Sequence, residues 1–224
     1  MATFDAFVFD MDGTLTDTES LWDEVRRGLA AEAGLEWPDE ATDAMMGMST
    51  AEWSAYLVDT VGLPGPPERA ADEVIDAMAA RYHQHLPTLP GAVDSVRRVA
   101  ALLPIGLASS SPRRLIDAVL DELGLADLFG ATVSTEEVER GKPAPDGFLR
   151  VCELLGADPT RCAAVEDSSN GLRSAHAAGM TVIAVPHQWH EPAADALALA
   201  AAVVPSLDDL DEGLLTRLAG ERLS

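Results

Sequence analysis

FDAFVFDMDGT, residues 4–14, joins a short apolar segment to a pair of aspartates. Aromatic and aliphatic residues crowd the segment 4–10, and this composition predicts a short, buried β-strand. Asp10 and Asp12 follow at the carboxyl end of that strand. An Asp-x-Asp-Gly sequence also occurs in simple turns, so its meaning depends on what the rest of the chain places beside it.

Strands and helices alternate over the second part of the chain. A helical pattern over 92–102 precedes an apolar segment at 104–108, and the alternation continues to the end. This order predicts an α/β fold with a doubly wound, Rossmann-like parallel sheet. Further strands are expected at 130–133, 161–166, 181–185 and 201–204, and a final helix at about 207–219.

Residues 19–86 differ from this pattern, because they are helical in character and contain no convincing strand. We expect three helical stretches, over about 19–34, 38–62 and 66–85. An insertion after the first strand would lie over the edge of the sheet at which ligands bind. We therefore expect a core of residues 1–17 and 88–224 and an all-helical cap of residues 18–87.

The composition limits the partners of the chain. A formal net charge of −23 would repel nucleic acid and anionic membrane surfaces. No apolar run approaches the ~20 residues that span a bilayer, and no secretory signal is recognisable. Cys152 and Cys162 lie in apolar stretches and are expected to be buried thiols. We predict a cytoplasmic, monomeric protein that acts on a small molecule, without nucleic-acid or membrane partners.

The basic residues are biased toward one type. Of 15 basic residues, only Lys142 is a lysine. Because arginine serves everywhere else, the retained lysine indicates a position that needs a compact ammonium group instead of a forked guanidinium.

Four polar clusters are expected at the ends of predicted strands. Each alone is also typical of a turn, a helix cap or a loop. Since the carboxyl ends of parallel strands meet at one edge of a sheet, the four together predict an active site. The clusters are residues 10–17 (DMDGTLTD), 108–111 (ASSS), 141–146 (GKPAPD) and 165–171 (VEDSSNG).

The acidic residues of these clusters suit phosphoryl transfer. Asp10 is a candidate nucleophile, because an ionised carboxylate can attack phosphorus without a base. Asp12 is a candidate general acid/base, which would protonate the leaving oxygen and later deprotonate water. Asp10, Asp167 and the backbone carbonyl of Asp12 could hold Mg²⁺, which prefers oxygen ligands. Glu166 is either a further ligand or an acceptor behind the ligands.

Serines and the single lysine supply groups for the phosphate. Ser109 and Ser110 are candidate phosphate-binding residues, and Lys142 would neutralise charge on the nucleophile and on the transferring phosphoryl group. We expect Ser111 to cap a helix that has Pro112 as its first residue. The N-terminus of that helix would also favour an anion.

This set of motifs, with its helical insertion, resembles the haloacid dehalogenase superfamily, in the branch of β-phosphoglucomutase and the sugar-phosphate phosphatases. The resemblance covers essentially the whole chain. It implies a Rossmann-like core, a four-helix-type cap, Mg²⁺ and an aspartyl-phosphate intermediate on Asp10. It also implies phosphoryl binding by Ser109 and Lys142 and metal binding by Asp167.

The resemblance leaves the reaction to be chosen. Dehalogenases of this superfamily lack the second aspartate, so Asp12 argues against dehalogenation, and phosphonoacetaldehyde hydrolases need a cap lysine that is missing here. The mutases carry a histidine and an arginine where this chain has Trp22 and Thr50. The segment 17–22 (DTESLW) is similar to hexitol-phosphate and 2-deoxyglucose-6-phosphate phosphatases. We predict a phosphatase, with two alternatives: a mutase, or a catalytically inactive binding module, although no catalytic carboxylate is missing.

We expect residues of the cap to determine which substrate is bound. Trp22, Met48, Thr50 and Trp53 are candidates to face the substrate, although the two tryptophans suit the cap core equally well. Arg113, which follows the serine cluster, either contacts the substrate or lies in solvent at the start of its helix.

Overall fold

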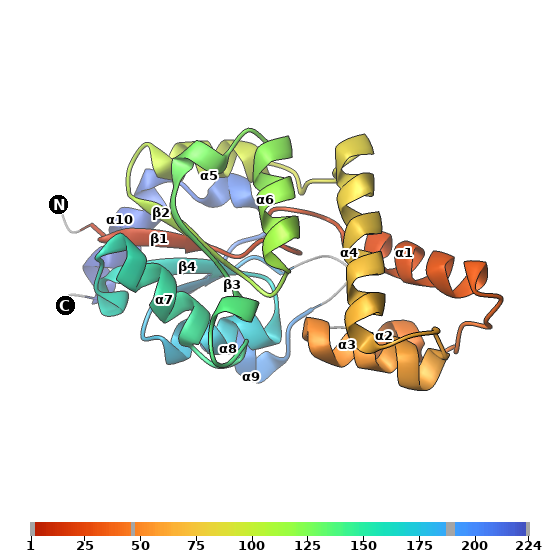
Figure 1. The fold of residues 1–224 in the computed structure, drawn as a ribbon. Helices are drawn as coiled ribbons and strands as arrows, with labels where there is room; N and C mark the ends of the chain where they lie inside the picture. The colour runs from red at the N-terminus through yellow and green to blue at the C-terminus, as the bar shows by residue number, and fades with distance from the viewer. Residues whose placement is uncertain (1–2, 46–47, 187–190, 223–224) are drawn as a thin grey trace. The chain divides into compact units, whose positions relative to one another are not determined.

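The structure, a computed structural model, describes residues 3–45, 48–186 and 191–222. Within these residues a sheet of six parallel strands has the order β3-β2-β1-β4-β5-β6 (Figure 1). The predicted doubly wound α/β fold is thereby confirmed. The strands are β1 (Ala6–Phe9), β2 (Ile105–Ser109), β3 (Phe129–Ser134), β4 (Cys162–Glu166), β5 (Thr181–Ala184) and β6 (Ala202–Val203).

Helices cover both faces of the sheet (Figure 1). Successive side chains of a strand point to opposite faces, so β1 contributes to two separate cores. Ala6 and Val8 pack in the cluster beneath one set of helices, whereas the rings of Phe7 and Phe9 lie 4.8 Å apart. The covering helices are α7 (Asp146–Leu155), α8 (Ser169–Ala177) and α9 (Ala194–Leu197) on one face, and α5 (Ala92–Ala100) and α6 (Arg113–Glu122) on the other.

The register of the central strands brings their carboxyl ends level. Phe9 pairs with Leu107 of β2 and with Val165 of β4. The N–H of Asp10 then donates to the carbonyl of Val165 at 3.1 Å. The residues that follow β1, β2 and β4 therefore emerge side by side at one edge of the sheet.

The contacts divide the chain into two units. The core unit comprises residues 1–17 and 87–224, and the inserted unit comprises residues 18–86. The inserted unit is helical, as predicted for a cap between β1 and β2. It contains α1 (Glu19–Glu32), α2 (Ala41–Met45), α3 (Thr50–Tyr56), a π-helical turn (Leu57–Val61) and α4 (Pro67–Gln84).

The helical stretch expected over 38–62 is divided in the structure into α2, α3 and the π-helical turn. The physical reason is a capping box. Ser49 accepts a hydrogen bond from the N–H of Glu52, whose side chain accepts from the N–H of Ser49, and this exchange starts a new helix. Residues 46–47, between α2 and Ser49, lie outside the described residues.

Two further helix boundaries differ from expectation. The final helix begins only at Glu212 as α10 (Glu212–Arg222), because Asp211 accepts from the N–H of Leu214, while residues 207–209 form a separate 3-10 turn. The helix after β2 has Pro112 at its N-cap and no side-chain cap, so Ser111 does not have the capping role predicted for it.

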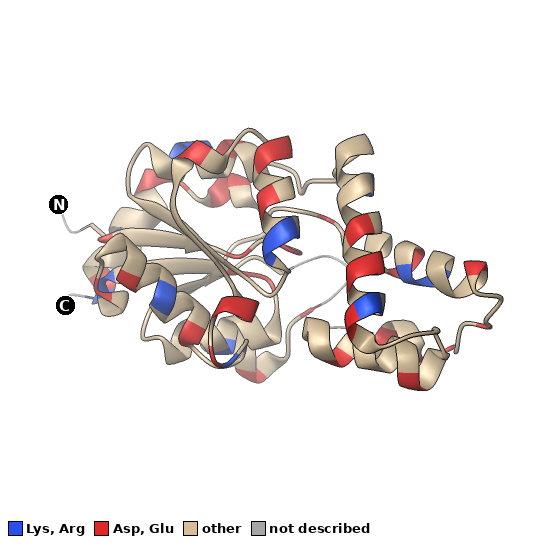
Figure 2. Ribbon diagram, in the orientation of Figure 1, with Lys and Arg blue, Asp and Glu red and all other residues tan. Residues whose placement is uncertain are grey.

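Charge is spread over the surface of the chain. Figure 2 shows acidic residues on helices of both units, in keeping with 38 acidic and 15 basic residues. No helix in the described ranges combines the length and the apolar character needed to cross a membrane.

Candidate active site

The turn after β1 presents Asp10 and Asp12 and lies directly against Asp167. The N–H groups of Leu15 and Thr16 donate to the carbonyl of Met11 at 2.7 and 3.0 Å, which closes the turn. Gly13 has a φ of +83°, and a Cβ at this position would lie 2.2 Å from Oδ2 of Asp167. Only glycine therefore allows this close approach of the turn to the end of β4.

Lys142 lies at the centre of the site. Its ammonium donates to Oδ1 of Asp10 at 2.5 Å, to Oε1 of Glu166 at 2.6 Å and to the carbonyl of Ala108 at 3.0 Å. An ammonium has three N–H donors, so these contacts use all of them. The side chain is only 7% exposed, and one cation thus joins groups from the ends of β1, β2 and β4.

Glu166 is held by its own loop as well as by Lys142. Its Oε2 accepts from the N–H groups of Asp167 and Ser168 and from the hydroxyl of Ser168, at 3.0–3.1 Å. A Cβ on Gly171 would lie 1.7 Å from Oε1 of Glu166, so this glycine makes room for the carboxylate. Both oxygens of Glu166 are engaged, which favours a role in orienting Lys142 and the loop.

Burial and mutual repulsion shift the pKa values of this cluster. Burial and the charge of Glu166 raise the pKa of Asp10 to about 7, and Lys142 offsets the increase only in part. The pKa of Asp167 is also raised, by burial and by the charges of Glu166 and Asp10. Burial alone would lower the pKa of Lys142, but the adjacent Asp10 and Glu166 raise it and keep the ammonium charged.

The residues present fit a divalent metal ion. Asp10, Glu166 and Asp167 are buried, and each offers a carboxylate oxygen within 4.8 Å of the others. Three buried carboxylates with one lysine leave negative charge that burial disfavours, and a cation would offset it. Because Glu166 has other partners, Asp10 and Asp167 are the better direct ligands. Hard oxygen donors of this kind suit a metal such as Mg²⁺.

Asp12 lies beside two serines from the end of β2. Its Oδ2 accepts from the hydroxyl of Ser111 at 2.7 Å and from the hydroxyl of Ser109 at 3.3 Å. The N–H of Ser111 donates to Oγ of Ser109 at 3.0 Å. Both serines are buried, whereas Ser110 between them is exposed.

Arg113 is engaged in structural ion pairs in the core unit. Its guanidinium donates to both carboxylate oxygens of Glu137 at 2.7 Å and to the side chain and carbonyl of Thr132. Glu137 raises the pKa of Arg113 through these hydrogen bonds. This network ties α6 to β3, and the substrate contact considered for Arg113 stays a prediction.

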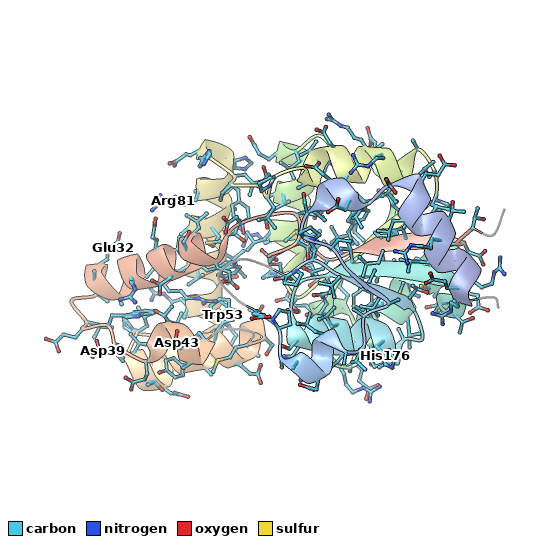
Figure 3. The ribbon with its side chains drawn as sticks, turned by 180° about the vertical axis from the view of Figure 1, so that it is seen from behind. Glu32, Asp39, Asp43, Trp53, Arg81 and His176 are labelled. Carbon is cyan, nitrogen blue, oxygen red and sulfur yellow. The ribbon has the colours of Figure 1, made fainter. Side chains whose placement is uncertain are left out.

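The four predicted specificity residues belong to the inserted unit. Trp53 (labelled in Figure 3) is 3% exposed, and its ring lies 5.9 Å from that of Trp22. The guanidinium carbon of Arg26 lies 4.8 Å and 5.0 Å from these two rings, and burial lowers the pKa of Arg26 to about 10. Oγ1 of Thr50 is buried without a hydrogen-bond partner among the described residues. Met48 is half-buried, and the specificity role of all four stays a prediction.

Most of the site residues predicted from the sequence lie together in the core unit, and Ser111 joins them. The core unit collects Asp10, Asp12, Ser109, Lys142 and the pair 166–167 at one sheet edge. Ser111 was missed because Ser-Pro is a strong helix-start signal.

Comparisons with known proteins agree with this geometry. The family model for haloacid dehalogenase-like hydrolases matches residues 4–179. Fructose-1-phosphate phosphatase YqaB of Escherichia coli (strain K12) is 32% identical over 80% of this chain and 94% of its own length. Hexitol phosphatase B of the same strain is 35% identical, over 81% and 83%. The crystal structure of β-phosphoglucomutase from Clostridium difficile, 24% identical, shares the fold with a TM-score of 0.80 over 98% of this chain and 99% of its own. The chain belongs to the haloacid dehalogenase-like hydrolases.

Proposed function

We propose that this protein is a Mg²⁺-dependent phosphatase that hydrolyses a small phosphorylated metabolite, either a sugar phosphate or a polyol phosphate. The observation that carries the proposal is the buried cluster in which Lys142 binds both Asp10 and Glu166, next to Asp167. The similarity to fructose-1-phosphate and hexitol phosphatases supports the substrate class.

In the first step, Asp10 attacks the phosphorus of the ester. A carboxylate oxygen forms a bond to phosphorus as the bond to the leaving alcohol breaks, and Asp12 gives its proton to the leaving oxygen. Lys142 and the hydroxyl of Ser109 offset the charge on the transferring group. The products of this step are the free alcohol and a phosphoryl group on Asp10.

In the second step, water releases the phosphoryl group. Asp12, now a carboxylate, takes a proton from the attacking water, and the bond from Asp10 to phosphorus breaks. Inorganic phosphate leaves, and both aspartates return to their starting protonation states. The two steps need the same Asp12 first as an acid and then as a base.

Magnesium would be held by Asp10, Asp167 and the backbone carbonyl of Asp12. When bound, it supplies positive charge that favours the ionised form of Asp10 and neutralises the phosphate oxygens. The net charge of −23 gives a reason for the metal, because the protein as a whole repels an anionic substrate. A cation at the site would make the binding of phosphate favourable there.

A mutase differs only in the acceptor of the phosphoryl group, which is a sugar hydroxyl instead of water. The fold shared with β-phosphoglucomutase is compatible with either acceptor. Trp22 and Thr50 are uncharged, whereas the resembling mutases have a histidine and an arginine at these positions. This difference favours water as the acceptor of the phosphoryl group.

We expect phosphate release from sugar or polyol monophosphates in a screen that includes nucleotide monophosphates, with Mg²⁺ present. Asp10→Asn should remove turnover, because the nucleophile is lost, while far-UV circular dichroism should show that the fold is retained. Phosphate release and the conversion of β-glucose 1-phosphate to glucose 6-phosphate are measured together. Isomerisation that outpaces phosphate release would replace the phosphatase by a mutase. Full activity of Asp10→Asn, with reversion to Asp excluded by mass spectrometry, would reject the nucleophile.

Lys142→Arg should lower kcat by about 100-fold or more, although the charge is kept. A planar guanidinium cannot donate to three convergent acceptors from the volume that the ammonium occupies. The matched control is Arg140→Lys, which changes an exposed ion pair with Asp146 near the same loop and should leave kcat unchanged. Near-normal activity of Lys142→Arg would show that the lone lysine has no special role.

Mg²⁺ should raise the Tm more at high pH than at low pH. The pKa of Asp10 is about 7 in the folded, metal-free protein and about 4 in an unfolded chain, so the folded state binds the extra proton. The stability contributed by that proton is present below about pH 4 and is lost as the pH rises through about 7. Mg²⁺ replaces the proton, so its stabilising effect should grow between about pH 5 and pH 8.

Thermal unfolding with EDTA and with excess Mg²⁺, at both pH values, measures this effect. Asp10→Asn is the matched variant, in which the pH dependence of the Mg²⁺ effect should shrink. An equal Mg²⁺ effect at both pH values in the unsubstituted protein would contradict the assignment of Asp10 as a ligand.

A further inference from the structure

Ser111 makes more hydrogen bonds than a helix cap or an ordinary loop residue requires. It is 6% exposed, and all three of its polar groups are hydrogen-bonded within the core unit. Its N–H donates to Ser109, its carbonyl accepts from the hydroxyl of Ser134 at 2.7 Å, and its own hydroxyl donates to Asp12 at 2.7 Å. The side chain that would ordinarily cap α6 is thus directed at the acid/base carboxyl.

The backbone of Ser111 is held firmly from β3. Ser134 is fully buried, and its N–H donates to Glu137, which in turn binds Arg113 through both carboxylate oxygens. This chain of contacts runs from a structural ion pair to the carbonyl of Ser111. It limits the positions that the Ser111 hydroxyl can take, and therefore the position of the group it binds.

Ser109 cannot do the same task during the reaction. A hydroxyl has one proton to donate, and the Ser109 contact with Asp12 is long, at 3.3 Å. When a phosphoryl oxygen takes that proton, the contact with Asp12 is lost, and the shorter bond from Ser111 remains. Ser109 would therefore donate to the phosphoryl group, while Ser111 donates to Asp12.

We propose that Ser111 is a positioning residue, which holds the Asp12 carboxyl by Oδ2 and directs its catalytic proton to Oδ1. A carboxyl that is protonated on Oδ1 still accepts a hydrogen bond at Oδ2, so the same contact serves both steps. It orients Asp12 as the acid that protonates the leaving alcohol and as the base that takes the proton from water. The role rests on the proposed phosphatase function and goes beyond the binding of phosphate.

The test compares two leaving groups in the purified, Mg²⁺-loaded protein. A sugar or polyol alkoxide needs a proton to leave, whereas the nitrophenolate of p-nitrophenyl phosphate does not. For Ser111→Ala we expect kcat on the alkyl phosphate to fall by about 30-fold, with KM changed less than about twofold. With p-nitrophenyl phosphate, a rapid burst of nitrophenolate near the unsubstituted rate should precede slow turnover, because only the second step still needs Asp12.

Two further variants separate positioning from packing. Ser111→Thr keeps a hydroxyl on the same carbon and should restore most of kcat on the alkyl phosphate. Ser95→Ala removes another buried serine hydroxyl, which donates to the carbonyl of Ala92 on α5, and should leave both substrates unaffected. Its Tm provides the reference for the loss of a buried serine.

Three results for Ser111→Ala would each overturn the positioning role. These are an equal loss of rate in the nitrophenolate burst and in alkyl phosphate turnover, a raised KM with a normal kcat, and no loss of activity. Failure of Ser111→Thr to recover activity, at a Tm equal to that of the unsubstituted protein, would also overturn it. If the unsubstituted protein releases no phosphate from any ester, the phosphatase function fails and the role of Ser111 with it. An active protein with an unaffected Ser111→Ala rejects only the role of Ser111.

Discussion

The ammonium of Lys142 is the contact on which the site depends. It joins Asp10 and Glu166 to the carbonyl of Ala108, and these groups come from three strands that are far apart in the sequence. A buried charge is costly unless it is paired, and removal of one partner leaves the others uncompensated. Each partner also has a place in the fold: Asp10 directly follows β1, and Glu166 accepts hydrogen bonds from the loop after β4. The packing of the core and the chemistry of the site therefore depend on the same cation.

This balance of charge also favours a bound divalent cation. One lysine cannot neutralise three buried carboxylates, and burial together with the remaining repulsion raises the pKa values of Asp10 and Asp167. A divalent cation would offset the remaining negative charge of the cluster and so reduce its repulsion of a phosphate group. An acidic chain can thus bind an anionic substrate, because the attraction is confined to the site.

Much of this arrangement could be predicted from the sequence, and the failures have definite physical causes. The ends of parallel strands meet at one edge whatever their separation along the chain, and this rule is sufficient to bring Asp10 and Asp167 together. Lys142 reaches them from the loop between β3 and α7. The alternation of strands and helices likewise predicted the sheet. A local sequence signal fails where a tertiary contact competes with it. Ser111 precedes a proline as a helix cap often does, but its hydroxyl donates to Asp12 instead. The sequence does not decide whether Glu166 binds the metal or orients Lys142, because a glutamate can do either. Only the contacts of its carboxylate in the structure favour the orienting role.

The central claim is that Asp10, held by Lys142, attacks phosphorus itself. The most direct measurement is the stereochemical course at phosphorus, with a substrate ester made chiral there by sulfur and an oxygen isotope and hydrolysed in isotopically labelled water. Two successive in-line displacements, first by Asp10 and then by water, predict overall retention of configuration. Overall inversion would mean that water attacks the ester in a single step, and it would contradict the account.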